Sequence, residues 1–255
     1  MAVVIWVFSG GGEAEIGIRN KDKRDEGGLI KFLQKNFPGC TFVRKTPARI
    51  KPGPKPGKSV GYGRTGKSLI AQINQELPIA LKNEPNKCDF ILVFDDLDCR
   101  NHLEQRERFL AAISEIPDTE EIPKFVGFAA PEIESWIIAD WDNTIAKSSD
   151  FRGRHEKMRW WLSTQKNIPF DTPESFSKYD NDRDCCQDKL SEALVESSTL
   201  AEFDSSVTRF SKGYHTPLLL LGIRPDEVQR KCPLFRELYH YLFNFPSSQE
   251  NKSRT

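Results

Sequence analysis

The feature that most constrains the fold is the sequence CDFILVFDDLD at residues 88–98, in which an apolar run leads directly into a group of acids. A short run rich in β-branched and aromatic residues is typical of a strand buried on both faces. Such strands belong to α/β proteins, which bind ligands at the carboxyl ends of their strands. Side chains alternate along a strand, so we expect Asp96 and Asp98 on one face and Asp95 and Leu97 on the other.

The neighbouring carboxylates of Asp96 and Asp98 indicate a metal site. Two ionised carboxylates side by side repel each other unless a positive charge lies between them. Mg²⁺ is a hard ion that binds oxygen ligands, and Mn²⁺ is the alternative. A second interpretation is that Asp95 or Asp98 caps a helix that begins near Arg100. One cap does not require three acids, so the sequence favours the metal site.

The rest of the first half of the chain alternates strand and helix patterns. Residues 2–8 are a second apolar run, followed by three glycines and by Glu13 and Glu15. Glycines after a strand let the backbone turn sharply and bring Glu13 near the strand end. Further strand or helix patterns occur at 29–37, 41–43, 103–116 and 124–129. The sequence therefore predicts an α/β fold with a mostly parallel sheet and helices on both faces.

Two further acids, Glu132 and Glu134, lie near the start of a helix predicted to begin at Pro131. Proline is favoured at the first position of a helix. Glu132 can act simply as a partner of the helix dipole. Glu134 lies on a largely apolar helix, where such a partner is not required. The helix follows a strand, so both acids are expected near the ends of the other strands.

A basic segment that contains no acid and many Pro and Gly residues spans residues 44–67. This composition predicts a loop that does not pack into a core. Local cation density binds a phosphate backbone without reading its sequence, so the loop is a candidate nucleic-acid contact. Its basic residues are Arg44, Lys45, Arg49, Lys51, Lys55, Lys58, Arg64 and Lys67. The alternative is a flexible, solvated loop without a partner.

The same segment contains a match to the P-loop pattern, GYGRTGKS at residues 61–68. A P-loop connects a buried strand to a helix, so that phosphate lies at the helix N-terminus. A helical pattern follows the match, but the preceding KPGPKPGKSVGY is incompatible with a central strand. A P-loop NTPase is therefore retained only as an alternative.

Beyond residue 142 the patterns are helical, and no strand is predicted. Helical spacing is present at 184–196, 203–210 and 232–243. The predicted organisation is an α/β domain at 1–145, a helical extension packed on it at 146–246 and a disordered tail at 247–255.

Composition limits the function classes. With 37 basic and 37 acidic residues the formal net charge is zero, so any nucleic-acid binding would depend on a local patch. The N-terminal apolar run is too short to span a membrane and lacks the basic residues that precede a signal peptide. The six cysteines lack CxxC spacing, so neither a zinc ribbon nor a disulfide scaffold is expected. We expect reduced thiols, a cytoplasmic location and no membrane contact.

Four stretches of the sequence together resemble a known family. They are an apolar strand followed by Gly and Glu, DLDC at 96–99, PEIESWIIAD at 131–140, and FSKGYHTP at 210–217 with CPLF at 232–235. Through these stretches the chain resembles the Toprim-like family, which was long classed as a domain of unknown function. The similarity covers nearly the whole chain. Its best-known member is AriB, the nuclease subunit of the PARIS anti-phage system. The EIESW and KGYHTP stretches are the most specific.

The resemblance implies a Toprim-like sheet in which a glutamate and an Asp-x-Asp pair hold Mg²⁺ for phosphodiester chemistry. The pair corresponds to Asp96 and Asp98, and the Glu-x-Glu helix to Glu132 and Glu134. Members of the family tend to act in defence against phage beside an ATPase of the ABC or SMC-like kind.

This chain departs from the family at the first strand. The family usually has Glu-Gly directly after that strand, whereas this chain has Ser9 and Gly10. The metal-binding glutamate would then be Glu13 or Glu15.

The leading hypothesis is a metal-dependent nuclease acting on DNA or RNA, tRNA included. The residues expected to act in catalysis are Glu13, Asp96, Asp98, Glu134, Lys212 and His215, of which the first four would also hold Mg²⁺ or Mn²⁺. Lys212 and His215 would meet the scissile phosphate, although His215 is equally compatible with a turn residue bonded to backbone. The alternatives are an inactive Toprim-shaped subunit that docks on an ATPase and the P-loop NTPase. Assembly into a homo-oligomer is left open.

Overall fold

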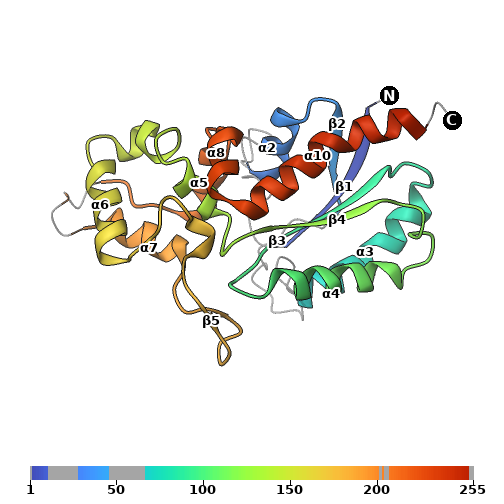
Figure 1. Ribbon diagram of the computed structural model, residues 1–255, viewed down its shortest axis with the longest axis horizontal. Coiled ribbons are helices and arrows are strands. Elements are labelled where there is room, and N and C mark those ends of the chain that lie inside the picture. Colours follow the sequence, from blue (N-terminus) through green and yellow to red (C-terminus); the bar gives the residue numbers. More distant parts are fainter. Residues whose placement is uncertain (1, 11–27, 46–66, 201–202, 204–206, 253–255) are drawn as a thin grey trace, which may run out of the picture.

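The computed structural model is an α/β protein built around a four-stranded sheet (Figure 1). The parts of the chain that it describes are residues 2–10, 28–45, 67–200, 203 and 207–252. The strands are β1 (Val3–Ser9), β2 (Cys40–Arg44), β3 (Phe90–Asp96) and β4 (Lys124–Ala129). They are all parallel, in the order β2-β1-β3-β4. The predicted fold class, a parallel sheet with helices on both faces followed by a helical part, is confirmed.

The predicted central strand is β3, and every one of its residues is buried. Its side chains alternate between two apolar cores, as the period of a strand requires. Phe90, Leu92 and Phe94 belong to one core, and Ile91 and Val93 belong to the other. Layers on both sides of the sheet therefore explain why this strand is continuously apolar.

Helices cover both faces of the sheet (Figure 1). On one face lie α2 (Leu29–Asn36) and α10 (Pro233–Lys252). On the other lie α3 (Lys67–Asn83) and α4 (His102–Ser114). Because α10 packs on β4 and shares a core with α2, the end of the chain completes the layer that covers the N-terminal sheet.

The remaining helices lie largely beyond the carboxyl ends of the strands (Figure 1). They are α5 (Glu134–Ala139), α6 (His155–Gln165), α7 (Leu190–Ser197), α8 (Lys212–Leu220) and α9 (Pro225–Lys231). Three short 3₁₀ helices accompany them: η1 (Ile145–Lys147), η2 (Ser149–Phe151) and η3 (Pro173–Ser175). Within the described residues, no helix combines the length and the apolar character needed to cross a bilayer.

Several boundaries differ from the sequence prediction. Helix α5 begins at Glu134 rather than at Pro131, because a turn that contains a cis Ala130–Pro131 bond precedes it. The cap of α4 is Asn101, whose side chain accepts hydrogen bonds from two backbone N–H groups. Neither Asp95 nor Asp98 has that role. Helix α10 continues to Lys252, past the predicted start of the tail at residue 247.

The second half of the chain also contains an unpredicted hairpin. Strands β5 (Tyr179–Asp180) and β6 (Cys185–Cys186) pair antiparallel, where the sequence analysis expected no strand and a helix from residue 184. Two-residue strands are too short to produce an alternating pattern. The described residues among 203–210 form no helix, and the N–H of Phe210 donates instead to Ser198 Oγ at 2.8 Å.

One disulfide joins Cys99 to Cys186, so the prediction that all thiols are reduced is wrong for this pair. The two Cα atoms lie 5.1 Å apart although 87 positions separate them along the chain. Chain packing produces this proximity, and the spacing of cysteines in the sequence does not reveal it. The free cysteines of the described residues are Cys40, Cys88, Cys185 and Cys232.

Candidate active site

Three carboxylates converge on one lysine at the carboxyl ends of the strands. Asp96 is the last residue of β3, and it shares the strand face of Phe94, which looks toward α5. Lys212, the first residue of α8, places its Nζ 3.4 Å from Asp96 Oδ2. The same Nζ lies 3.1 Å from Glu132 Oε1 and 3.2 Å from Glu134 Oε2. We call these four residues the carboxylate–lysine cluster.

Each carboxylate of the cluster is also held by a hydrogen bond from a neighbouring segment. Asp96 Oδ1 accepts from the backbone N–H of Ile133 at 2.9 Å, which ties β3 to the start of α5. Glu132 accepts from both the backbone N–H and the Oγ of Ser191, at 3.1 and 3.0 Å. Glu134 Oε1 accepts from Thr216 Oγ1 at 2.8 Å. The strand end, α5, α7 and α8 therefore meet in one hydrogen-bonded arrangement.

The cluster is buried except at its lysine. Asp96 is 6% exposed, and Glu134 is 0% exposed within a helix whose six residues are all buried. The Lys212 side chain is 36% exposed, so the cluster meets solvent at its ammonium group. Burying an ionised carboxylate is costly unless it is paired. Three buried acids around one partly exposed lysine are therefore an arrangement more typical of a functional site than of a structural core.

Electrostatics pushes the pKa values of the three acids apart. Burial raises the pKa of Asp96 to about 7, aided by Glu134 and Glu132 and opposed by the Lys212 charge. Burial likewise raises the pKa of Glu134. For Glu132, burial is outweighed by the Lys212 charge and the Ser191 hydrogen bonds, so its pKa is lowered. Burial disfavours the Lys212 ammonium, but the three carboxylates outweigh that cost and raise its pKa.

These pKa values predict a pH dependence of stability. The pKa of Asp96 is about 7 in the folded protein against an ordinary value of 3.8, so the folded state binds this proton more tightly. The stability that this group contributes is full below its unfolded pKa and is lost as the pH rises to its folded pKa. Between pH 5 and pH 8 the free energy of unfolding should therefore fall less for the Asp96→Asn variant than for the natural protein, by about 2 kcal/mol. Urea unfolding of both proteins at the two pH values measures this, and equal losses would contradict it.

The donor atoms suit a hard divalent ion, but in this arrangement an ammonium takes the central position. Among the described residues, no group of three or more His, Cys, Asp or Glu side chains is placed to hold a metal ion. The three carboxylates supply the oxygen ligands that Mg²⁺ prefers. Glu134 Oε2 is buried, and the Lys212 Nζ lies 3.2 Å from it. Glu13 and Glu15, the glutamates predicted to complete the site, lie outside those residues.

Asp98 does not join the cluster. Strand β3 ends at Asp96, and Asp98 has a left-handed backbone with φ of +48°, so the strand alternation does not extend to it. Its carboxylate accepts a hydrogen bond from Arg100 at 3.1 Å. Leu97 does lie in the opposite core, as predicted for that face. The predicted pairing of Asp96 with Asp98 is therefore replaced by pairing of Asp96 with the acids of the β4–α5 turn.

His215 is buried behind the cluster and supports the start of α8. Its Nδ1 accepts from the backbone N–H of Ser211 at 2.8 Å, and its Nε2 lies 3.4 Å from Asp150 Oδ2. The ring stacks on Phe210, with centroids 5.4 Å apart. Burial lowers the pKa of the imidazole, which favours the neutral form that these contacts require. The geometry therefore favours a positioning role, in which His215 orients the helix that carries Lys212.

Most of the predicted nucleic-acid-binding loop lies outside the described residues. Arg49, Lys51, Lys55, Lys58 and Arg64 lie outside the described residues, as does most of the P-loop match. Arg44 ends β2, and Lys67 begins α3. The Nζ of Lys45 lies 2.5 Å from Glu84 Oε1 and 4.2 Å from the centre of the Trp6 ring. Lys45 therefore packs against the fold.

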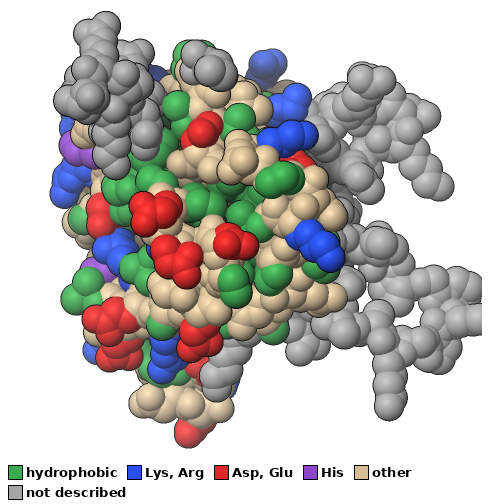
Figure 2. Space-filling model, turned by 90° about the vertical axis from the view of Figure 1, so that its right-hand side faces the viewer, with side chains coloured by type: hydrophobic (Ala, Val, Ile, Leu, Met, Phe, Trp, Pro, Cys, Tyr) green, Lys and Arg blue, Asp and Glu red, His purple; other side chains and the backbone are tan. Residues whose placement is uncertain are grey.

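The opposite end of the sheet presents acids to solvent. Figure 2 shows that face, where acidic and apolar side chains occupy the middle and lysines and arginines lie toward the margin. Exposed acids of the loop between α4 and β4 are Glu115, Asp118, Glu120 and Glu121. Negative charge repels a phosphate backbone, so this face is not suited to approach by nucleic acid.

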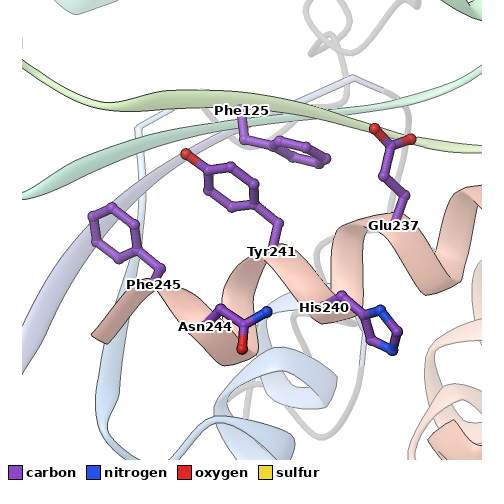
Figure 3. A pocket seen from close by; sticks show the side chains of 6 residues that line it. All are labelled: Phe125, Glu237, His240, Tyr241, Asn244 and Phe245. Carbon is purple, nitrogen blue, oxygen red and sulfur yellow. The ribbon is translucent and has the colours of Figure 1, made fainter. Parts of the chain in front are cut away.

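A separate cavity of about 450 Å³ lies between β4 and α10. Figure 3 shows the ring of Phe125 facing that of Tyr241, and their centroids are 4.3 Å apart. Phe125 is near the amino end of β4, whereas Glu132 follows the carboxyl end. The length of the strand therefore separates this apolar cavity from the carboxylate–lysine cluster.

The sequence analysis missed the residues that support the cluster. Ser191 and Thr216 hold Glu132 and Glu134 through side-chain hydrogen bonds. Ser191 stands in no recognisable motif, and Thr216 lies in the KGYHTP stretch but was assigned no role. Glu132 itself was interpreted equally well as a dipole partner, although its carboxylate is as close to Lys212 as that of Glu134. The signal in the sequence that could have identified Glu132 was its place, with Glu134, just after a predicted parallel strand.

The all-parallel sheet with helices on both faces is consistent with a Toprim-like fold. The resemblance to the Toprim-like family itself stays a prediction from the sequence. Comparisons with protein-family models, with curated proteins and with solved structures found no match in any of the three.

Proposed function

We propose that this protein is a metal-dependent nuclease that hydrolyses phosphodiester bonds of DNA or RNA. The observation that carries the proposal is the convergence of Asp96, Glu132 and Glu134 on Lys212 at the carboxyl ends of the strands. Ligand sites of open α/β sheets lie at this edge. Phosphodiester hydrolysis uses both components of the cluster, since buried carboxylates bind divalent ions and a partly exposed ammonium binds phosphate.

Glu132 and Glu134 would hold Mg²⁺ or Mn²⁺, with Lys212 turning outward toward the substrate and Asp96 left beside the ion as a base. When bound, the divalent ion polarises a phosphoryl oxygen and stabilises charge on the attacking and leaving oxygens. Before that exchange the Lys212 ammonium compensates the buried negative charge, which explains how the acids remain packed together. Its exposed fraction places it at the boundary between the cluster and solvent, where a phosphate would arrive.

Asp96 is the candidate general base of this reaction. A base is most effective when its pKa is near the working pH, and burial raises the pKa of Asp96 to about 7. The hydrogen bond from the Ile133 N–H fixes one carboxylate oxygen, so the other, Oδ2, remains directed at Lys212. Asp96 would take a proton from the attacking water through that oxygen.

Substrate and partner follow from the sequence resemblance. Resemblance to the Toprim-like family implies that this protein is an effector of anti-phage defence that works in the cytoplasm with an ABC or SMC-like ATPase. The basic segment at residues 44–67 would add affinity for the phosphate backbone. The choice among DNA, RNA and tRNA depends on base contacts, for which the described residues contain no recognisable element.

The test is a cleavage assay on the full chain. Purified protein is incubated with plasmid, single-stranded DNA and tRNA, each with Mg²⁺, with Mn²⁺ or with a chelator, in the presence and absence of a candidate ATPase. We expect cleavage of at least one substrate with a divalent ion and none with the chelator. Thermal unfolding with and without each ion reports metal binding independently. The absence of both cleavage and a metal-dependent rise in melting temperature would overturn the proposal.

One observation favours a second function, that of an inactive subunit that docks on an ATPase. The Lys212 ammonium already compensates the carboxylates, so the cluster is a stable arrangement without any metal. This alternative predicts that divalent ions change neither the melting temperature nor any nucleic acid, while binding to the ATPase persists in the Asp96→Asn variant. A metal-dependent shift in the melting temperature would count against it.

A further inference from the structure

The Cys99–Cys186 disulfide connects two segments that hold the carboxylate–lysine cluster. Cys99 lies shortly after Asp96, in the loop that follows β3. Cys186 ends the β5–β6 hairpin, and the next helix, α7, carries the Ser191 that donates to Glu132. The cross-link therefore fixes the position of one segment relative to the other.

The hairpin has little else to anchor it. Among residues 177–189, all of which are described, only Cys186 is buried. The other tertiary contacts are polar: Arg100 Nε lies 3.2 Å from Asp184 Oδ1, and the Asp184 side chain is 63% exposed. The Arg100 side chain is 15% exposed and also donates to the backbone carbonyl of Asp184, so it anchors the hairpin at Asp184 but buries no further side chain of the hairpin. Figure 1 shows the hairpin projecting away from the rest of the protein.

The disulfide is accessible from one side. Cys186 is buried, whereas Cys99 is only partly buried, so Cys99 is the half of the pair that a reagent in solution would approach. The backbone around Cys99 is held in a left-handed conformation, with φ of +62° there and +48° at Asp98. Such conformations persist when surrounding structure holds them, and here the cross-link, Arg100 and a hydrogen bond from the Asp98 N–H to the Pro131 carbonyl surround the turn.

We propose that Cys99–Cys186 is a redox-modification site, opened by a dithiol reductant, that controls the order of the loop after β3 and of the hairpin. One thiolate of the reductant attacks Cys99 Sγ, and Cys186 leaves as a thiolate that takes up a proton. The second thiol of the reductant then displaces Cys99 and forms the reductant's own disulfide. Two electrons pass from the dithiol to the protein disulfide.

Opening the cross-link removes the only buried anchor of the hairpin. Helix α7 keeps its own buried anchors, Leu190 and Leu194, so Ser191 and its hydrogen bonds to Glu132 stay in place while the hairpin before it loosens. At the same time the left-handed backbone at Cys99 loses the cross-link, although the N–H of Asp98 still donates to the Pro131 carbonyl at 2.9 Å. Any effect on cleavage rests on the proposed nuclease function, whereas the change in local order does not.

The experiment compares the full chain before and after treatment with dithiothreitol. Alkylation in denaturant should label the 4 free cysteines of the untreated protein and all 6 after reduction. Hydrogen exchange of residues 97–101 and 177–189 should become faster by about tenfold or more on reduction, with no change in β1, β3 and α7. The Cys186→Ser variant should show the fast exchange without reductant and should not respond to it.

Cys185→Ser is the matched control, because it removes the neighbouring free thiol and leaves the disulfide intact. It should respond to dithiothreitol like the natural protein. Labelling of every cysteine without reductant would overturn the proposal, as would reduction that leaves hydrogen exchange unchanged. If Cys186→Ser fails to fold, hydrogen exchange of the natural protein at increasing concentrations of dithiothreitol provides the same test. A protein that responds in exchange but never cleaves nucleic acid would overturn the proposed function and leave the redox site standing.

Discussion

The Asp96→Asn variant is expected to cleave nucleic acid about 10²- to 10⁴-fold more slowly than the natural protein, the range for loss of a general base. Asparagine keeps an oxygen that can accept the Ile133 N–H, so the turn before α5 is retained. The substitution removes the negative charge beside Lys212 and the group that would accept a proton. The measurement is initial cleavage rate with Mg²⁺ on the most susceptible substrate.

The matched control is Asp118→Asn, which makes the same chemical change at an exposed residue of the opposite face. Asp118 has a φ of +66°, and asparagine tolerates this left-handed conformation well. The control should cleave at the natural rate. Unfolding by urea establishes that Asp96→Asn remains folded. A folded Asp96→Asn variant that cleaves as fast as the control would remove Asp96 from the reaction.

The Lys212→Met variant is expected to be destabilised by about 3 kcal/mol, the lower end of the cost of breaking a buried ion pair. The lower end applies because 36% of the lysine side chain is exposed. Methionine has a similar length but no charge, so the carboxylates of Asp96, Glu132 and Glu134 would face one another uncompensated. Urea unfolding at pH 8 measures the loss. Lys178→Met, which removes an exposed lysine, is the control and should unfold like the natural protein.

Two further measurements identify the cause of this destabilisation. Lowering the pH should restore much of the stability of Lys212→Met, since protonation removes the repulsion among the acids. Adding Mg²⁺ or Mn²⁺ should also stabilise it if the carboxylates bind the ion, because a ligand of the native state adds RT ln(1 + [L]/Kd). Adding Glu134→Gln to Lys212→Met should cost less than the two separate changes together, which a double-mutant cycle would detect. A Lys212→Met variant as stable as the control would show that the cluster does not depend on its lysine.

Much of the architecture was predictable because it depends on local patterns. The apolar runs that became β1 and β3 are short and bounded by turn residues, and this is sufficient to distinguish a buried strand from a helix. The two-residue strands of the hairpin carry no such pattern. The start of α5 was misplaced because Pro131 is as compatible with the preceding turn as with a first helical position.

The sequence by itself determined that a buried strand ends in acids at the ligand-binding edge of a parallel sheet, because apolar periodicity and strand polarity are local properties. Tertiary structure alone decided which charges meet there. Lys212 reaches Asp96 across 116 positions of the chain, and Cys99 reaches Cys186 across 87. Contacts over such separations arise from the order of the strands and the packing of α5, α7 and α8 around them, which no pattern of neighbouring residues encodes. Asp98, adjacent to the strand in sequence, turns instead to Arg100 because the backbone leaves the extended conformation after Asp96.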